Sequence, residues 1–203
     1  MAKGKTCICD CCGHTDAVRI GEPIPDIAFH VYHKNNDIKM SLGDFKGRWL
    51  ILFFYPADFT FVCPTELEDM ADHYDGFLNE GAEVVSVSTD SIHVHKAWRD
   101  TSPSIKKIQF PMASDRTHAL SHAFGVHLEN EGNSLRGSFI IDPDGILQSY
   151  EVNADGIGRN AEELLRKFQA AKFVHDNGNK VCPANWHPGD DTLQPGLDLV
   201  GKI

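Results

Sequence analysis

The sequence predicts an α/β fold in which one central mixed β-sheet is flanked by helices on both faces. The main observation is an alternation along the chain. Short, continuously apolar segments, such as WLILFFY at residues 49–55, are followed by segments whose apolar residues recur at helical spacing. In addition, the chain has 203 residues, of which 41% are apolar, so that one domain of ordinary size can bury a core.

The elements of the first half follow from the residue pattern. Residues 29–40 are interpreted as a hairpin of two short strands around a turn at 34–37. Residues 48–55 are expected to form a strand buried on both faces, because the apolar run is continuous. A helix is predicted over 63–79, ending before Gly81, and the next strand over 83–88.

In the second half, helices are expected at about 91–100 and 117–124. Residues 138–142 and 146–152 are predicted to pair as a hairpin, and Asn160 is expected to begin a long helix, with Glu163 placed to complete a capping box. After residue 177, Gly and Pro become frequent and the periodicity fades. The chain is therefore divided into a cysteine-rich tail (1–17), a folded domain (18–176) and an irregular C-terminal arm (177–203).

Charge and apolar content limit the expected partners. The chain has 19 basic and 29 acidic residues, and this excess of negative charge would repel nucleic acid and anionic membranes. Its longest apolar run, residues 49–55, is too short to span a bilayer, and the first residues lack the apolar stretch of a signal peptide. We expect a soluble cytoplasmic protein without nucleic-acid or membrane partners.

The cysteines are unevenly distributed, which fits a reducing compartment rather than a disulfide framework. Cys63 and Cys182 stand alone, and four others lie in the first dozen residues, namely Cys7, Cys9, Cys11 and Cys12. With His14 these four offer enough ligands for Zn²⁺. A structural zinc site normally uses two ligand pairs, however, and the tail contains a single C-x-x-C, so a thiol-rich tail is favoured and a zinc site is the alternative.

Cys63 lies where the buried strand gives way to a helix. In PADFTFVCPTE (56–66), the strand ends at Pro56 and the helix begins at about Cys63, with Pro64 in its first turn. The unpaired N–H groups and the dipole of a helix N-terminus favour a thiolate, which is a nucleophile. Thr60 can hydrogen-bond a molecule bound there, and Pro56 can screen it from water. The alternative is a small buried apolar residue, but the helix-start position favours the nucleophile.

The histidines are not expected to bind metal. His118 and His122 are four residues apart but lack the glutamate of an H-E-x-x-H motif, and His93 and His95 would point to opposite sides of a strand or diverge on a helix. Both pairs are interpreted as surface or packing residues. Trp98 is interpreted as a core or interface residue.

Three separated segments resemble the typical two-cysteine peroxiredoxins. FFYPADFTFVCPTELE matches the P-x-x-x-T-x-x-C active-site pattern with Pro56, Thr60 and Cys63. SLRGSFIIDPDG resembles the segment that supplies an active-site arginine, here Arg136, and GIGRNAEELLRK contains a supporting candidate, Arg159. The segment KVCPANWHPGDDTLQPGLDLVGKI is similar to the resolving-cysteine arm of bacterial alkyl hydroperoxide reductase peroxidase subunits, with Cys182 as the resolving residue.

The resemblance implies a thioredoxin-like fold and a thiol peroxidase with an antioxidant role and no metal or organic cofactor. Cys63 would attack the peroxide, while Thr60, backbone N–H groups and Arg136 stabilise the developing charge. The resulting sulfenic acid would form a disulfide with Cys182. Glu66, one turn after Cys63, is interpreted either as a residue that orients Arg136 or as a solvated first-turn carboxylate.

The same resemblance implies partners. Cys182 would come from the other subunit of a two-fold symmetric homodimer, and five dimers would close into a ring-shaped decamer. An external dithiol protein, a thioredoxin or a flavoprotein reductase, would reduce the disulfide.

Two other classes of function are weighed against the peroxidase. A thioredoxin-like disulfide reductase requires both redox cysteines in one C-x-x-C at a helix start, which Cys63 lacks. A ring-forming holdase or a metal-binding protein would use the same fold without turnover. A peroxide-consumption assay separates the holdase or metal-binding protein from the peroxidase.

Overall fold

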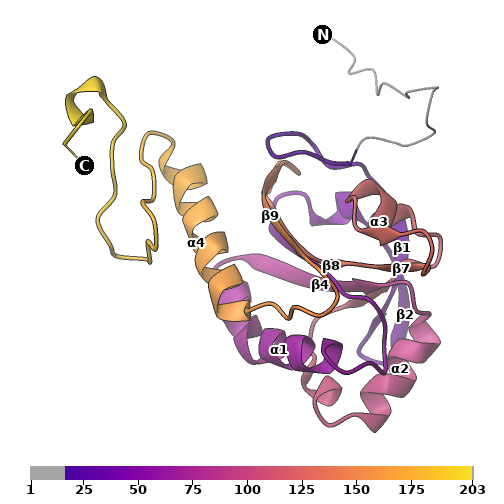
Figure 1. Ribbon diagram of the computed structural model, residues 1–203. Coiled ribbons are helices and arrows are strands. Elements are labelled where there is room, and N and C mark those ends of the chain that lie inside the picture. Colours follow the sequence, from indigo (N-terminus) through magenta and orange to yellow (C-terminus); the bar gives the residue numbers. More distant parts are fainter. Residues whose placement is uncertain (1–16, 203) are drawn as a thin grey trace, which may run out of the picture.

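A seven-stranded mixed sheet lies at the centre of the computed structural model, which describes residues 17–202 (Figure 1). Its strand order is β2-β1-β5-β4-β3-β8-β9. The strands are β1 (Ala28–His33), β2 (Asn36–Ser41), β3 (Trp49–Phe54), β4 (Ala82–Ser88), β5 (Met112–Ser114), β8 (Arg136–Ile141) and β9 (Leu147–Asn153). A separate two-stranded ladder pairs β6 (His127–Leu128) with β7 (Asn133–Ser134).

The pairing explains why the sheet is mixed. β3, β4 and β5 run parallel to one another, whereas β1 joins β5 and β8 joins β3 in antiparallel ladders. β3 therefore has a neighbouring strand on each side, and all six of its residues are buried, as expected from its continuous apolar run. The two hairpins, β1 with β2 and β8 with β9, form the outer parts of the sheet.

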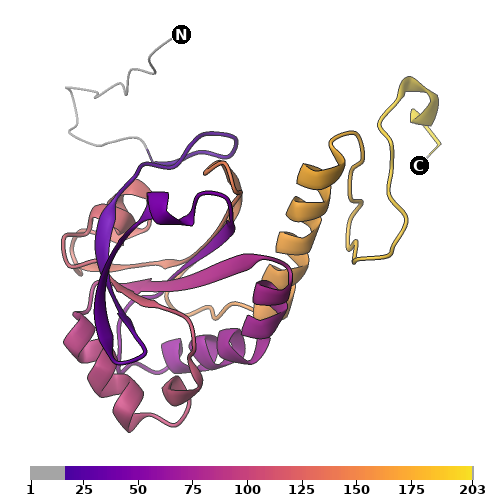
Figure 2. The ribbon, with the colours of Figure 1, turned by 180° about the vertical axis from the view of Figure 1, so that it is seen from behind.

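Helices cover both faces of the sheet, but unequally. The helices are α1 (Cys63–Asn79), α2 (Ile92–Thr101), α3 (Ala119–Ala123) and α4 (Ala161–Asn177). Side chains of α1, α2 and α4, including Phe77, Trp98 and Phe168, join one core cluster, whereas Leu120 of α3 belongs to the cluster on the other face. Figures 1 and 2 show α1 and α2 on one side of the sheet and the short α3 on the other. The predicted α/β fold is thus confirmed.

Besides the β6–β7 ladder, which was not predicted, three details differ from the sequence-based expectation. β5 was not predicted, because three residues that follow Pro111 carry too short a pattern. α3 is shorter than 117–124: the Asp115 carboxylate accepts hydrogen bonds from the N–H groups of Leu120 and Ser121, and the helix begins at Ala119. The predicted capping box of α4 is incomplete, as described next.

Only half of the predicted capping box is formed at the start of α4. The Asn160 side chain accepts a hydrogen bond from the N–H of Glu163 at 2.8 Å, as expected. The Glu163 carboxylate, however, accepts two hydrogen bonds from the Arg166 guanidinium, at 2.6 and 2.8 Å, and does not return to Asn160. A nearby cation is thus a better partner for this carboxylate than a backbone N–H.

The arm after α4 is largely irregular and extends beyond the end of that helix, away from the sheet (Figures 1 and 2). Its regular features are a bridge between Val181 and Leu193 and a 3₁₀ turn at Leu197–Leu199. Among residues 17–202, none of the helices combines the length and the apolar character that crossing a membrane requires.

Trp186 is the one residue of this arm that is buried against its own chain, among the residues that the structure describes. Its ring lies 5.0 Å from that of Phe173 on α4, and its carbonyl accepts a hydrogen bond from Arg166. Leu197 and Val200, by contrast, are 93% and 75% exposed. Trp186 therefore fastens the first part of the arm to α4 and leaves the apolar end of the arm uncovered.

Candidate active site

The loop between β3 and α1 positions Cys63, and a buried polar network fixes this loop. The hydroxyl of Tyr55, the first residue after β3, donates a hydrogen bond to Asp58 at 2.7 Å. The other oxygen of Asp58 lies 2.8 Å from Nδ1 of His95, whose Nε2 lies 3.2 Å from the carbonyl oxygen of Ala113. Burial raises the pKa of the Asp58 carboxyl, although the hydrogen bond and charge of His95 oppose that rise.

This network was not predicted from the sequence. His95 was interpreted as a surface or packing residue. Its side chain is fully buried on the side of α2 that packs against the sheet, whereas His93 on the same helix is exposed. No local motif links Asp58 and His95, because they come together only through the packing of α2 on the sheet. The loop is therefore held in place by hydrogen bonds whose partners are distant in the sequence.

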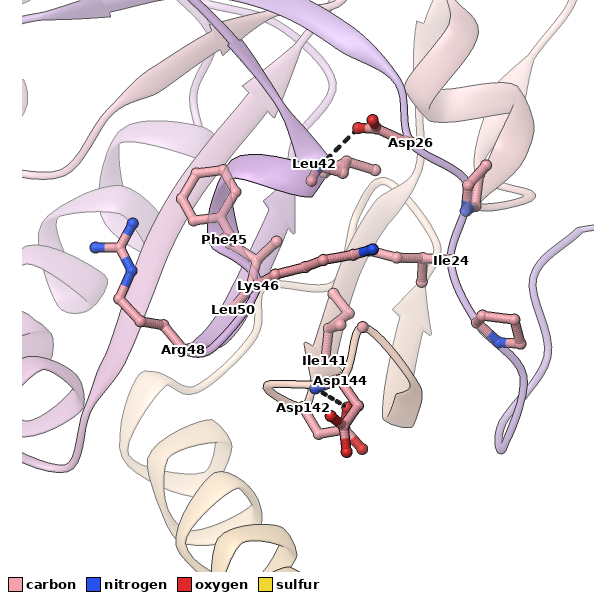
Figure 3. Close-up of a pocket in the computed structure, with 14 residues that line it drawn as sticks. Ile24, Asp26, Leu42, Phe45, Lys46, Arg48, Leu50, Ile141, Asp142 and Asp144 are labelled. Atoms are coloured by element: carbon pink, nitrogen blue, oxygen red, sulfur yellow. Dashed lines mark hydrogen bonds between the residues drawn. The ribbon is translucent and has the colours of Figure 1, made fainter.

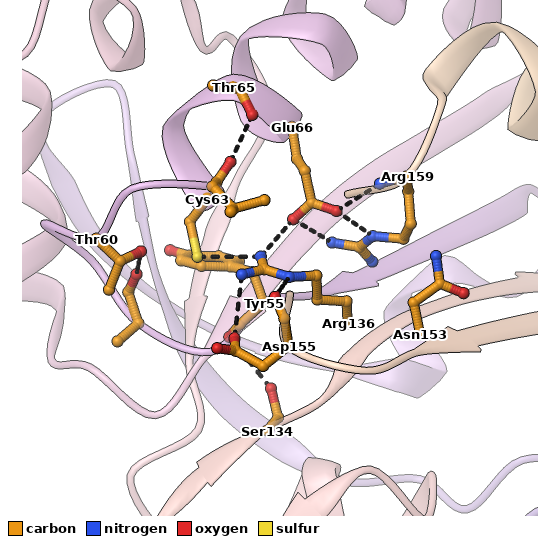
Figure 4. Close-up of polar contacts among 12 residues, drawn as sticks. Tyr55, Thr60, Cys63, Thr65, Glu66, Ser134, Arg136, Asn153, Asp155 and Arg159 are labelled. Atoms are coloured by element: carbon orange, nitrogen blue, oxygen red, sulfur yellow. Dashed lines mark hydrogen bonds and ion pairs between the residues drawn. The ribbon is translucent and has the colours of Figure 1, made fainter. Parts of the chain in front are cut away.

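Cys63 is the first residue of α1 and is completely buried. Pro64 occupies the first turn, where the helix leaves backbone N–H groups without partners of its own. Thr60 lies beside Cys63 in the preceding loop, and its hydroxyl donates a hydrogen bond to the carbonyl oxygen of Ala57 at 2.9 Å (Figure 4). Pro56 is buried at the start of the loop.

Arg136, at the start of β8, points its guanidinium at the sulfur of Cys63. Its Nη1 lies 3.3 Å from Sγ and also donates to Glu66 at 2.7 Å (Figure 4). Nε donates to the carbonyl oxygen of Asp155 at 2.6 Å, and Nη2 to the carboxylate of the same residue at 3.1 Å. All three nitrogens of the guanidinium thus have acceptors, which fixes the orientation of the group.

Glu66 links Arg136 to Arg159. Its Oε1 accepts hydrogen bonds from the backbone N–H and Nε of Arg159, at 2.9 and 2.8 Å. The side chain of Glu66 is only 2% exposed, so the interpretation as a solvated carboxylate is wrong and the interpretation as a residue that orients Arg136 agrees with the contacts. Burial would raise the pKa of Glu66, but the hydrogen bond and charge of Arg159 outweigh it and lower this pKa.

The charges of this buried cluster favour an anion at the sulfur. Arg136, Glu66 and Arg159 are each at most 3% exposed, and two guanidinium groups face one carboxylate. Burial would lower the pKa of Arg136, but its hydrogen bond with Cys63 and the charge of Glu66 raise it, so the group keeps its proton. The second guanidinium is otherwise paired only with the carboxylate of Asp155, whose side chain is 69% exposed, so a thiolate at Cys63 would add buried negative charge to this cluster.

Two residues of the cluster had no signal in the sequence. Asp155 lies in the turn between β9 and α4 and accepts from Arg136 with both its carbonyl and its carboxylate. Phe53 of β3 lies under Arg159, whose guanidinium carbon is 3.4 Å from the centre of the ring. An aspartate in a turn and a phenylalanine in a buried strand have ordinary structural explanations, so their roles become visible only in the folded chain.

Cys182 does not meet Cys63 within one chain. Its sulfur lies 3.9 Å from the carbonyl oxygen of Ala170 on α4, and both cysteines are free thiols. The start of α4 lies near α1, where the N–H of Ala161 donates to Asp69. Ala170 is nine residues further along, a rise of about 13 Å in an α-helix. Burial raises the pKa of the Cys182 thiol, although the charge of Arg166 opposes this rise.

A pocket on the other face of the sheet is not part of this cluster. It is lined by the segment before β1, the turn after β2 and the turn between β8 and β9, and its lining includes Leu42, Phe45 and Ile141 (Figure 3). These three residues belong to the core cluster opposite the one that contains Cys63. The pocket has no cysteine in its lining, and the thiol chemistry therefore belongs to the Cys63 site.

Comparison with known proteins agrees with the geometry of the site. The model of the AhpC/TSA family matches residues 20–150, and that of the C-terminal domain of 1-Cys peroxiredoxin matches residues 170–200. Alkyl hydroperoxide reductase C of Staphylococcus haemolyticus is 51% identical over 183 residues, covering 90% of this chain and 97% of the relative. The corresponding protein of Escherichia coli is 52% identical over 171 residues, covering 84% and 91%.

Solved structures show the same relationship. The crystal structure of Enterococcus faecalis AhpC is 49% identical and superimposes with a TM-score of 0.79, covering 81% of this chain and 98% of that one. The reduced 2-Cys peroxiredoxin of Plasmodium vivax is 33% identical, with a TM-score of 0.84 and coverages of 88% and 94%. The chain therefore belongs to the AhpC/TSA family, as a two-cysteine peroxiredoxin similar to alkyl hydroperoxide reductase C.

Proposed function

We propose that Cys63 is the nucleophile with which this thiol-dependent peroxidase reduces hydrogen peroxide and organic hydroperoxides in antioxidant defence. The observation that carries the proposal is the hydrogen bond from Arg136 to the sulfur, in a buried cluster where two arginines face one glutamate. An arginine stays charged at all relevant pH values, so it can stabilise both a thiolate and a departing oxygen.

The chemical step follows from this arrangement. The Cys63 thiolate attacks the terminal peroxide oxygen, an S–O bond forms and the O–O bond breaks. The departing oxygen takes a proton and leaves as water or an alcohol, and the sulfur is oxidised to a sulfenic acid. Arg136 stabilises the negative charge on that oxygen. The Thr60 hydroxyl donates its hydrogen bond to the carbonyl oxygen of Ala57, so its lone pairs are free to accept a hydrogen bond from the peroxide.

Glu66 and Pro56 act indirectly in this proposal. Glu66 and its partner Arg159 hold the Arg136 guanidinium in position through a chain of charge-assisted hydrogen bonds. Buried Pro56 helps to exclude water from the reacting atoms. The cycle needs neither a metal ion nor an organic cofactor, because the thiols carry the electrons.

Cys182 is proposed to resolve the sulfenic acid as a residue of the partner subunit. Within one chain α4 separates Cys182 from Cys63, and the arm that carries Cys182 ends in the exposed apolar residues Leu197 and Val200, which suit a contact with a second copy. Two-fold symmetry then gives two equivalent disulfides per homodimer, and five dimers would close into a decamer. A dithiol protein, either a thioredoxin or a flavoprotein reductase, would reduce the disulfide in the cytoplasm.

The experiment that tests this function is a cross-linking assay. In a variant whose Cys7, Cys9, Cys11 and Cys12 are all changed to Ser, one equivalent of hydrogen peroxide should convert the reduced chain into a covalent dimer on a non-reducing gel. The four changes are needed because the N-terminal thiols, which lie outside the described residues, can cross-link chains by themselves. Adding Cys182→Ser should prevent the dimer while leaving the first peroxide reduction intact.

The position of the oxidised band decides between two disulfides. A band that runs as a monomer with Cys63 bonded to Cys182 would mean that the bond closes within one chain, and the exchanged arm would be wrong. Peptide mapping of the band by mass spectrometry identifies the linked cysteines. Turnover measured with a thioredoxin system and with a flavoprotein reductase then identifies the reductant.

The cysteine-rich tail (1–17) is proposed to be dispensable for the peroxidase domain (18–176) and the arm (177–203), since the family match begins at residue 20. Deletion of residues 1–17 should leave peroxide turnover with a small dithiol reductant nearly unchanged. Steady-state rates of the full and the shortened chain provide the measurement. A large loss of turnover, or stoichiometric zinc that disappears with the deletion, would instead favour the metal-binding tail.

A further inference from the structure

Three histidines gather on the opposite side of the sheet from α1, where sequence analysis had interpreted two of them as surface or packing residues. They are His118 and His122, at the start and end of α3, and His127 in β6. The imidazole ring of His127 lies 4.5 Å from that of His118 and 4.3 Å from that of His122, measured between ring centres. Among residues 17–202, no other group of three or more His, Cys, Asp or Glu side chains converges in a way that fits a metal ion.

The backbone produces this convergence. His118 has a left-handed conformation (φ = 59°) and precedes α3, and one turn of helix places His122 on the same side. The chain then reverses at Gly125 and enters β6, which brings His127 between the other two rings. The sequence contains only the spacing of His118 and His122, and the third histidine joins them through this reversal.

Glu129 adds a carboxylate to the cluster. Its two oxygens lie 3.5 Å from Nδ1 of His122 and 3.7 Å from Nε2 of His127. The ring of His127 is oriented from behind by Ser121, whose hydroxyl lies 3.4 Å from Nδ1 and itself donates to the carbonyl oxygen of His118. Nδ1 of His127 therefore donates to Ser121, and Nε2, on the side of Glu129, presents its lone pair. A hydrogen bond of this kind behind the ring is typical of metal-binding histidines.

We propose that His118, His122, His127 and Glu129 form a binding site for a divalent transition metal, with Zn²⁺ as its best-suited ion. Three imidazoles and one carboxylate are ligands that Zn²⁺ prefers in a tetrahedral site. The candidate ligand nitrogens already lie within 4.8 Å of one another. Two ligands of one zinc ion are at most about 4 Å apart, so only small side-chain rotations are needed.

Exposure agrees with a site that an ion can reach. The side chains of His122 and Glu129 are 44% and 64% exposed, so they can rotate toward the ion, whereas His127 is 4% exposed and fixed. The site is separate from the peroxidase chemistry, since none of its side chains contacts Cys63 or Arg136. The ion would join α3 to β6 and so stabilise this face of the fold.

The test is a zinc titration of the full chain in the variant with Cys7, Cys9, Cys11 and Cys12 changed to Ser. Competition with a chromophoric chelator should show one Zn²⁺ bound per chain. His122→Ala should weaken binding by more than about tenfold, because the loss of even an outer-shell partner costs about 10–100-fold in affinity. His93→Ala, which removes an exposed histidine of α2, is the matched control and should leave the affinity unchanged.

Two further measurements distinguish a metal ion bound at this site from one bound to other side chains of the protein. Co²⁺ in place of Zn²⁺ should give the visible absorption of a tetrahedral site, and His122→Ala should remove it. At the same Zn²⁺ concentration, the melting temperature should rise more in the parent variant than in Glu129→Gln, whose exposed side chain can be changed without harm to the fold. Absence of a one-to-one complex, or equal affinity in the parent and His122→Ala, would overturn the assignment.

Discussion

Replacing Cys63 with serine is expected to abolish peroxide reduction and to leave the fold intact. The change is nearly isosteric, and the hydroxyl can still accept the hydrogen bond that Arg136 directs at position 63. A neutral hydroxyl is nevertheless a poor nucleophile, and it cannot form the sulfenic acid on which the cycle depends. Peroxide consumption should fall to the rate of the uncatalysed reaction, while the thermal melting curve stays close to that of the parent chain.

Cys182→Ser is the matched control for this experiment. It removes the other free thiol of the described residues, which lies in the arm and not in the arginine cluster. One equivalent of peroxide should still be reduced per chain, because the first step needs only Cys63, and turnover should then stop for lack of a resolving thiol. Substantial peroxide reduction by Cys63→Ser would mean that another group attacks the peroxide, and the mechanism would be wrong.

The elements that could be predicted from the sequence are those with a local pattern. The continuous apolar run of β3, the helical spacing of α1 and the turn residues between β8 and β9 each encode their structure within a few residues. The same holds for the position of Cys63, because a strand, a short loop and Pro64 define the helix start. The short β5 had no such pattern, and its pairing with β1 and β4 comes from the sheet.

The side chains around Cys63 were only partly predictable, because their contacts span the chain. Arg136 was identified through a family resemblance rather than through its own surroundings. Burial of Glu66, which decided between its two interpretations, follows from the segment at Arg159 that lies 93 positions away. In the sequence, Asp155 was an ordinary turn residue, and the histidines of α3 and β6 had no pattern that set them apart from surface or packing residues. Long-range packing, which a single sequence does not reveal, brought these groups together.

Arg136→Met should lower the rate of Cys63 oxidation by about 10²–10³-fold, the usual loss when one donor to a developing negative charge is removed. Methionine fills a similar volume but offers neither a charge nor a hydrogen-bond donor. The thiolate then loses its cationic partner at 3.3 Å, and the departing oxygen loses its main stabilising group. Stopped-flow measurement of the single-turnover oxidation separates this step from the later reduction of the disulfide.

The fold should survive this change, because Glu66 keeps a partner. Arg159 still donates to Glu66 through its backbone N–H and its guanidinium, and the Asp155 carboxylate, with its side chain 69% exposed, can be hydrated instead. A buried carboxylate without any partner would be much more costly. Arg116→Met, at an exposed arginine remote from Cys63 in the sequence, is the matched control and should oxidise at the parent rate. An Arg136→Met variant that also oxidises at the parent rate would show that the helix N-terminus alone activates Cys63, so that the guanidinium serves the packing of the site and not its chemistry.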